Sequence, residues 1–306
     1  MTDLATAQPA APATPATPAT PATPAMPAVS GADAGGTWAL RRRQLAAVIR
    51  LELRKGYRGR GIIGLLILAM APPAVFALRL MVPAALPDPT NLGEATMLMA
   101  YAFDFILRSV VFLGCVLIFG NLIRREVLDR SLHFYFLAPL RRELLVVAKY
   151  LTGILVSFAA FGASTLATFA LIYWPYDSHL RNDFMLHGPG LANLGWYLLV
   201  TALACAGYGA VFLTLGFFFR SPALPALAFL GWETIHFLLP PALKLLSVIH
   251  YLQALCPVAI PQGPFAVLSD APSHATAIGG LLLLTVLLVA ISAWRIRRME
   301  IAYLDD

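Results

Sequence analysis

Long apolar runs, separated by short polar connections, fill most of the chain after residue 60. A run of about 20 apolar residues can cross the hydrocarbon core of a membrane as a helix. Six runs reach or approach this length, at residues 61–82, 98–123, 144–174, 191–219, 223–246 and 276–294. Pro72-Pro73 and Pro240-Pro241 interrupt the first and fifth runs, which is tolerated where neighbouring helices or water satisfy the freed backbone groups. The pattern predicts an all-α, polytopic membrane protein with six transmembrane helices.

The composition favours the same class. Hydrophobic residues make up 59% of the 306 residues and charged residues only 12%, with a mean hydropathy of +0.75. A soluble domain carries roughly twice that charged fraction. The net charge of +6 does not indicate a nucleic-acid partner, and we expect none, because basic residues in a membrane protein chiefly report its orientation.

The basic residues gather on alternate connections between the runs. They precede the first run, occupy the connection between the second and third, lie in the turn after the fourth and follow the sixth. The opposite connections contain only Arg181. Because cytoplasmic loops carry an excess of Lys and Arg, both termini are predicted to be cytoplasmic.

Two segments precede the first run. Residues 1–36 are rich in alanine, threonine and proline and repeat the tripeptide ATP, which predicts a disordered tail. Residues 37–60 fit an amphipathic helix with Arg43, Arg50, Arg54 and Arg58 on one face and apolar residues on the other, where Glu52 also falls. Such a helix is typical of an interfacial elbow that lies along membrane lipid headgroups. The alternative is a plain charge cluster that only fixes orientation.

Residues 249–275, before the last run, are apolar and contain no basic residue, but several prolines break them. The segment is too short and too broken to cross twice. It fits a re-entrant or interfacial hairpin buried against protein; an exposed loop is the alternative, and the hydrophobicity argues against it.

The sequence lacks the motifs of common catalytic and nucleotide-binding sites. It contains no Gly-Lys pair, and therefore no P-loop, and no H-E-x-x-H motif. Cys115, Cys205 and Cys256 do not have the spacing of a metal or redox site. We therefore expect no catalytic residue, metal site or cofactor in this chain, and we do not expect it to be an enzyme.

Four ionisable residues lie within the runs and are candidates to line a pathway or an interface. Asp104 and Arg108 are one helical turn apart and can pair, although near the outer end of a span they can also simply snorkel. Glu233 and His236 lie mid-run, where a carboxylate without a purpose is costly. An E-x-x-H pair can be half of a di-metal site, but that needs a second copy and further glutamates. A polar contact inside the bundle or between subunits is the preferred interpretation.

A charged segment, RREVLDRSLHFYFLAPLRRE at residues 124–143, separates the second and third runs. Its apolar residues share one helical face, whereas Arg125, Asp129, Arg130 and His133 share the other. Pro139 ends this helix and permits a new one that leads into the third run. A short helix with so little slack must move when the spans move, which is typical of a mechanical coupling element.

The segment resembles the coupling region of a known family, the permease subunits of ATP-binding-cassette transporters of the second exporter type. In that family an interfacial elbow helix precedes six spans. A loose pattern follows the second span: E-x-x-x-[GR]-[ST]-L, about six residues, P, then R-[RE]-E and a lysine. The matching residues here are Glu126, Arg130, Ser131, Leu132, Pro139, Arg141, Arg142, Glu143 and Lys149. The resemblance covers about residues 38–300.

The resemblance implies that two such subunits, identical or different, form a translocation pathway in the bacterial cytoplasmic membrane. Separate ATPase subunits, which hold the ATP and Mg, would dock on the elbow and coupling helices. The ATPase-coupling residues would be Arg125, Glu126, Asp129, Arg130, His133, Arg141, Arg142 and Glu143. Two other functions stay open: a stand-alone membrane carrier or membrane-embedded enzyme that uses Glu233 and His236, and a non-transporting scaffold.

Overall fold

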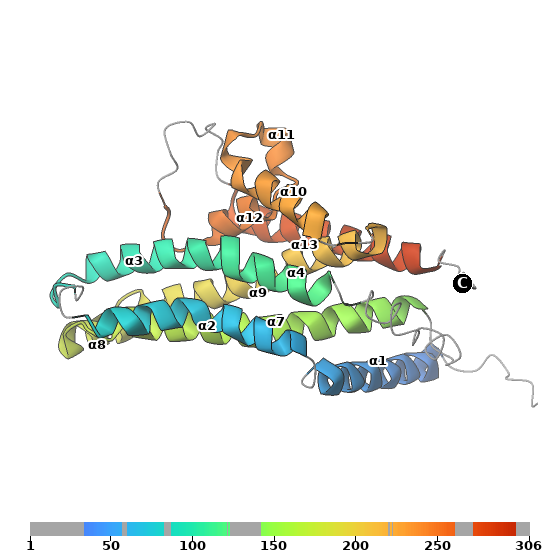
Figure 1. Cartoon of the computed structure of the whole chain (residues 1–306), viewed down its shortest axis with the longest axis horizontal. Helices are drawn as coiled ribbons and strands as arrows, with labels where there is room; N and C mark the ends of the chain where they lie inside the picture. The colour runs from blue at the N-terminus through green and yellow to red at the C-terminus, as the bar shows by residue number, and fades with distance from the viewer. Residues whose placement is uncertain are drawn as a thin grey trace, which may run out of the picture. The chain divides into compact units, whose positions relative to one another are not determined.

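The computed structural model describes residues 34–56, 60–82, 87–120, 122, 142–219, 221, 223–260 and 272–297. All regular secondary structure within these residues is helical, which confirms the predicted all-α class (Figure 1). The chain divides into two units, Met1–Leu40 and Arg41–Asp306. Of the first unit, the structure describes residues 34–40, which begin helix α1.

Five long helical segments within the described residues are apolar enough to cross a membrane. They are α2 (Arg60–Leu80), the continuous run of α3 (Leu92–Phe105), η2 (Ile106–Val111) and α4 (Phe112–Phe119), α7 (Arg142–Tyr173), α9 (Gly190–Phe218) and α13 (His274–Arg297). They correspond to the first, second, third, fourth and sixth predicted runs. The chain is therefore a multi-pass membrane protein.

The first of these helices differs in detail from the prediction. Pro72 and Pro73 do not interrupt α2, which continues through both of them with their side chains buried. A proline removes its own backbone hydrogen bond and crowds the preceding turn. The remaining helical bonds face no competing water in an apolar environment, so the helix can continue.

The predicted fifth span, 223–246, is wrong as a single helix. The chain instead forms α10 (Ala223–Thr234), the 3-10 turn η3 (His236–Leu238), α11 (Pro241–Lys244) and α12 (Val248–Leu255). Leu239 and Pro240 are extended, with ψ of 146° and 152°. A residue before proline is pushed out of the helical region, so the pair Pro240-Pro241 enforces the break.

The short helices α10 to α12 belong to the segment that joins α9 to α13, two long helices that run in the same direction. Thr214 on α9 shares hydrogen bonds with Ser292 and the Leu288 carbonyl on α13, and Gly207 contacts Leu281. Higher numbers on α9 thus meet higher numbers on α13, so the two helices run in the same direction. The connection from the end of α9 to the start of α13 must therefore run back along the bundle. Six crossings of the membrane remain a prediction.

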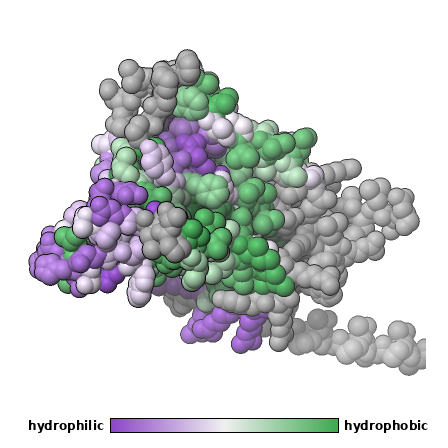
Figure 2. All heavy atoms as spheres, turned by 60° about the vertical axis from the view of Figure 1, so that its left-hand side comes forward, coloured by the Kyte–Doolittle hydropathy of each residue, from purple (hydrophilic) through white to green (hydrophobic). Residues whose placement is uncertain are grey.

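Helix α9 lies at the centre of the packing and contacts α4, α7, α12 and α13. The outer sides of the long helices carry apolar side chains instead of polar ones. Examples are Ile63, Ile67, Val75 and Leu78 on α2 and Leu283, Val286 and Leu287 on α13, all exposed. Hydrophobic residues cover much of the face shown in Figure 2. Such a surface fits contact with lipid chains.

Helix α1 (Ala34–Gly56) covers most of the range predicted for the elbow helix. Arg43, Arg50 and Arg54 are exposed, whereas Val48 is buried against Leu145 and Ala148 of α7. The two-faced character of the helix is therefore as predicted, and its position at the membrane surface stays a prediction. The tail up to residue 33 and residues 124–141 of the coupling segment lie outside the described residues. Of the segment 249–275, residues 249–260 and 272–275 are described.

Orientation gives a direct test of the predicted topology. In a variant without the three native cysteines, single cysteines at Ser178 and Ser273 should react with a membrane-impermeant reagent added to intact cells. Both serines are exposed and belong to connections without excess positive charge. A cysteine at Ser131 should react only after the membrane is opened; reaction in intact cells would contradict the predicted orientation.

Candidate functional site

The four ionisable residues predicted within the runs meet in one place. Arg108 lies in η2, a π-helical turn inside the second span, and donates from Nε to both Asp104 carboxylate oxygens at 2.9 and 3.1 Å. Its Nη1 also donates to the backbone carbonyl of Glu233 at 3.4 Å. The predicted Asp104–Arg108 pair is therefore confirmed, and it also connects the second span to α10. π-Helical turns are frequent at functional sites.

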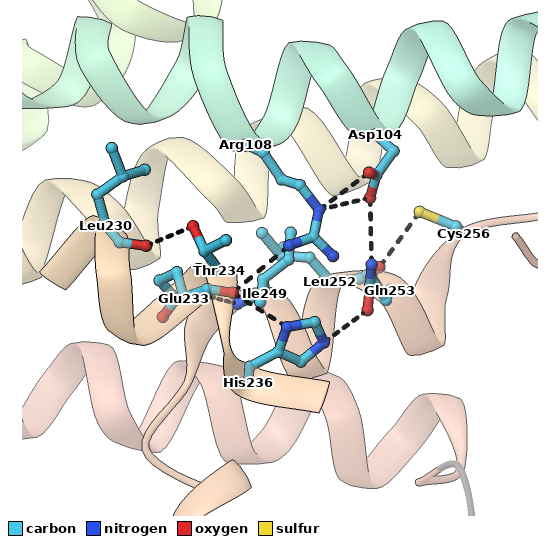
Figure 3. A network of polar contacts seen from close by, with 10 residues as sticks. All are labelled: Asp104, Arg108, Leu230, Glu233, Thr234, His236, Ile249, Leu252, Gln253 and Cys256. Atoms are coloured by element: carbon cyan, nitrogen blue, oxygen red, sulfur yellow. Dashed lines mark hydrogen bonds and ion pairs between the residues drawn. The ribbon is translucent and has the colours of Figure 1, made fainter. Parts of the chain in front are cut away.

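A second set of contacts connects His236 to the same pair (Figure 3). The His236 Nδ1 lies 3.0 Å from the Glu233 carbonyl oxygen, and its Nε2 lies 3.0 Å from Oε1 of Gln253. Gln253 donates from its side-chain nitrogen to Asp104 at 3.1 Å. A continuous polar chain thus runs from Asp104 through Gln253 and His236 to the end of α10.

The Glu233 carboxylate makes hydrogen bonds that are separate from those of the Glu233 backbone carbonyl. It is only 4% exposed and accepts three hydrogen bonds, from the Ser247 hydroxyl at 3.1 Å and from the backbone N–H groups of Val248 and Ile249 at 2.9 Å each. These residues begin α12. Helix N-termini expose unpaired N–H groups and a partial positive charge, so Glu233 caps α12 from another helix.

The cap explains why an ionisable residue lies at this position. Ser247 is the N-cap residue of α12 but makes no side-chain capping bond to the helix. Glu233 supplies the missing acceptor across the break between α10 and α12. The carboxylate and the helix start satisfy each other, which removes much of the cost of burying either one.

A cavity of about 180 Å³ adjoins the polar chain. The residues that line it come from the second span, α9, η3, α11, α12 and the described segments that flank residues 261–271. Its polar lining includes Asp104, Tyr197, His236, Lys244, His250, Gln253 and Cys256. Among the residues that the structure describes, no three His, Cys, Asp or Glu side chains are grouped to hold a metal ion.

Sequence reasoning missed Gln253, Ser247 and the π-helical turn. Gln253 is an uncharged polar residue in an apolar segment, three positions after His250, and that isolation was the available signal. Nothing in the local sequence indicates that Ser247 shares its cap with a residue 14 positions earlier. The π-helix at 106–111 has no sequence signature that we recognise.

The cytoplasmic end of the bundle, as predicted from the charges, contains two ion pairs on the first turns of α7. Lys149, whose side chain is 2% exposed, pairs with Glu52 of α1 at 3.0 Å. Glu143 pairs with Arg297 at the end of α13. Glu52, which the sequence places on the apolar side of its helix, is thereby explained. Of the eight predicted coupling residues only Glu143 has a described side chain; Arg142 has a described backbone alone.

Comparison with known proteins supports one family. The sequence pattern of the family described as ABC-2 family transporter protein matches residues 48–231, from α1 to α10. Neither a curated protein nor a solved structure matches the chain at a significant level. The matched range covers more than half of the chain and includes four of the five long apolar helices found among the described residues. The chain therefore belongs to the ABC-2 family of transporter proteins.

Proposed function

We propose that this chain is the permease subunit of an ATP-driven exporter. Two copies, or one copy and a related chain, would form the pathway, and separate ATPase subunits would supply ATP and Mg. The observation that carries the proposal is the family match over residues 48–231, which includes the charged segment between α4 and α7. The chain itself contains no P-loop, so ATP hydrolysis would belong to a partner.

The packing around α7 supports a route for mechanical coupling. The coupling segment leads directly into the first turns of α7, where Glu143 pairs with α13 and Lys149 pairs with α1. A push on the segment would therefore act on three helices at once. Lys149 is buried, and breaking a buried ion pair costs about 3–5 kcal/mol, so this contact resists separation when α7 is displaced.

The four ionisable residues support different roles within this proposal. Asp104 and Arg108 have side chains that are 26% and 29% exposed, so they are candidates to face the pathway or the second subunit. Glu233 and His236 are buried, at 4% and 3% exposure, and would hold the subunit together from inside.

We place the complex in the bacterial cytoplasmic membrane, with lipids around the apolar outer surface.

The stand-alone carrier is the weaker alternative. A carrier that uses Glu233 would need its carboxylate to bind and release a substrate ion or a proton during each cycle. Three hydrogen bonds from the start of α12 already engage that carboxylate. Releasing it would leave two backbone N–H groups and a hydroxyl without partners, so α12 would have to reorganise in every cycle.

A flexible insert in the coupling segment should abolish ATP-driven transport without preventing the ATPase from docking. Inserting two glycines beside Pro139 should leave co-purification with the ATPase nearly unchanged while ATP hydrolysis no longer drives transport, because the flexible insert absorbs the displacement. Reversing the charges of Arg125, Glu126 and Arg130 should instead weaken docking, at about 1 kcal/mol or less for each exposed pair. Binding, hydrolysis and transport should be measured in the same vesicles. Normal transport by the glycine variant would show that the segment is a passive anchor.

A further inference from the structure

The hydrogen bonds of the Asp104–Gln253–His236 chain do not match the number of protons that these groups ordinarily carry. A backbone carbonyl can only accept, so Nδ1 of His236 must donate to the Glu233 carbonyl. Nε2 faces the Gln253 side-chain oxygen, which also only accepts. Both ring nitrogens can donate at once only when the imidazole carries two protons and is charged.

Turning the Gln253 amide round does not remove the mismatch. Its nitrogen then donates to Nε2 of a neutral His236, but its oxygen faces the Asp104 carboxylate, which it meets at 3.1 Å. Two acceptors in contact repel each other unless the carboxyl group carries a proton. In either orientation the complete chain contains one proton more than an ionised aspartate and a neutral histidine provide.

We propose that the Asp104–Gln253–His236 chain is a proton-binding site, in which one proton completes the hydrogen bonds that connect the second span to η3 and α12. The proton resides on His236 in one amide orientation and on Asp104 in the other. Without it, one of the contacts must open. The adjoining cavity has room for water to deliver and remove the proton.

Charged and titratable groups surround the site on several elements, and Tyr197 from α9 also lines its cavity. Asp104 from α3 and Glu233 from α10 favour a positive imidazole, whereas Arg108 from η2 opposes it. Lys244 from α11 and His250 from α12 line the same cavity, as does Cys256. Opposite charges thus lie around the ring, and the direction of the hydrogen bonds adds the requirement for one further proton. Removing a charged imidazole from water is costly, so we expect the proton to bind at mildly acidic pH.

The titration of His236 tests the site without any assumption about an ATPase, so it can fail while the proposed function stands. The full-length chain, labelled with ¹⁵N in its histidine rings, is placed in lipid nanodiscs and titrated by NMR from about pH 8 to about pH 4.5. The difference from His236→Gln assigns the signal. We expect both ring nitrogens of His236 to become protonated, with a midpoint below the ordinary histidine value of about 6.5.

One variant separates the hydrogen-bond chain from simple charge effects. Gln253→Met keeps every charge and nearly the same volume but breaks the chain, so the midpoint should fall by about one pH unit, a tenfold loss of proton affinity. Asp104→Asn can donate to the turned amide, so a neutral His236 satisfies the whole chain and the midpoint should fall as well. Glu94→Gln is the matched control, because it removes one exposed charge from the same helix and should shift nothing.

Two results would overturn the proposal. One is a His236 ring that keeps a single proton throughout the range in the wild-type chain. The other is a midpoint that is the same in the wild-type chain and in Gln253→Met. If Gln253→Met fails to fold, the wild-type titration alone decides, by whether the His236 ring takes up a second proton.

Discussion

Replacing Glu233 by glutamine should release the start of α12. The amide keeps one oxygen but turns a second hydrogen-bond acceptor into a donor, which then faces groups that also donate. Hydrogen bonds to a charged group contribute roughly 1.5–3 kcal/mol each, and an unsatisfied buried donor costs about 1–3 kcal/mol. We expect α12 to lose about 3 kcal/mol of local stability.

Hydrogen–deuterium exchange measures this loss directly, because local opening exposes the backbone N–H groups of Val248 and Ile249. A change of about 3 kcal/mol corresponds to roughly 100-fold faster exchange. Glu94→Gln should leave both amides unchanged. Unchanged protection in Glu233→Gln would mean that the carboxylate does not cap α12.

Adding a methyl group beside the Phe119 ring should have the second large effect, on the stability of the protein. The Phe119 ring, 1% exposed, lies between two glycines: a Cβ at Gly153 on α7 would come within 2.4 Å of it, and a Cβ at Gly209 on α9 within 2.7 Å. The ring cannot move away from one helix without meeting the other. Gly153→Ala and Gly209→Ala should each destabilise the protein by about 1–3 kcal/mol, the usual cost of overpacking.

The matched control is Gly195→Ala, on α9 as well, where an added Cβ meets open space. It should be neutral or slightly stabilising, because alanine is the better helix former. Thermal unfolding in detergent should rank the three variants in this way. Phe119→Leu should partly rescue both destabilised variants; equal unfolding temperatures for Gly195→Ala and Gly209→Ala would contradict the packing.

The sequence was most informative where a single local property decides the structure. Hydropathy and length located α2, the second span, α7, α9 and α13, because a helix is the structure that satisfies its own backbone in an apolar environment. The spacing of Asp104 and Arg108 likewise predicted their pair. The prolines were misread in one case: Pro72-Pro73 leave α2 intact, whereas Pro240-Pro241 divide the predicted fifth span.

The remainder depends on contacts between distant segments. Glu233 meets Ser247 and the start of α12 only because the chain turns back at the proline pair, and Lys149 meets Glu52 only because the end of α1 contacts the first turns of α7. Gln253 is part of the site because α12 packs near the second span. No local pattern encodes such partners, and the sequence therefore placed ionisable residues at mid-span without indicating what they bind.

The central claim is that residues 124–143 contact an ATPase, and site-specific photo-crosslinking tests it most directly. A photoreactive amino acid is placed at Arg130 in the full-length chain, in its own cells, and the crosslinked product is identified by mass spectrometry. A matched probe at Ser178, on a connection predicted to lie on the opposite side, is the control. We expect the Arg130 probe to capture a protein with a P-loop ATPase sequence and the Ser178 probe not to capture one. Efficient crosslinking from Arg130 to lipids or other proteins only, with no such ATPase, would contradict it.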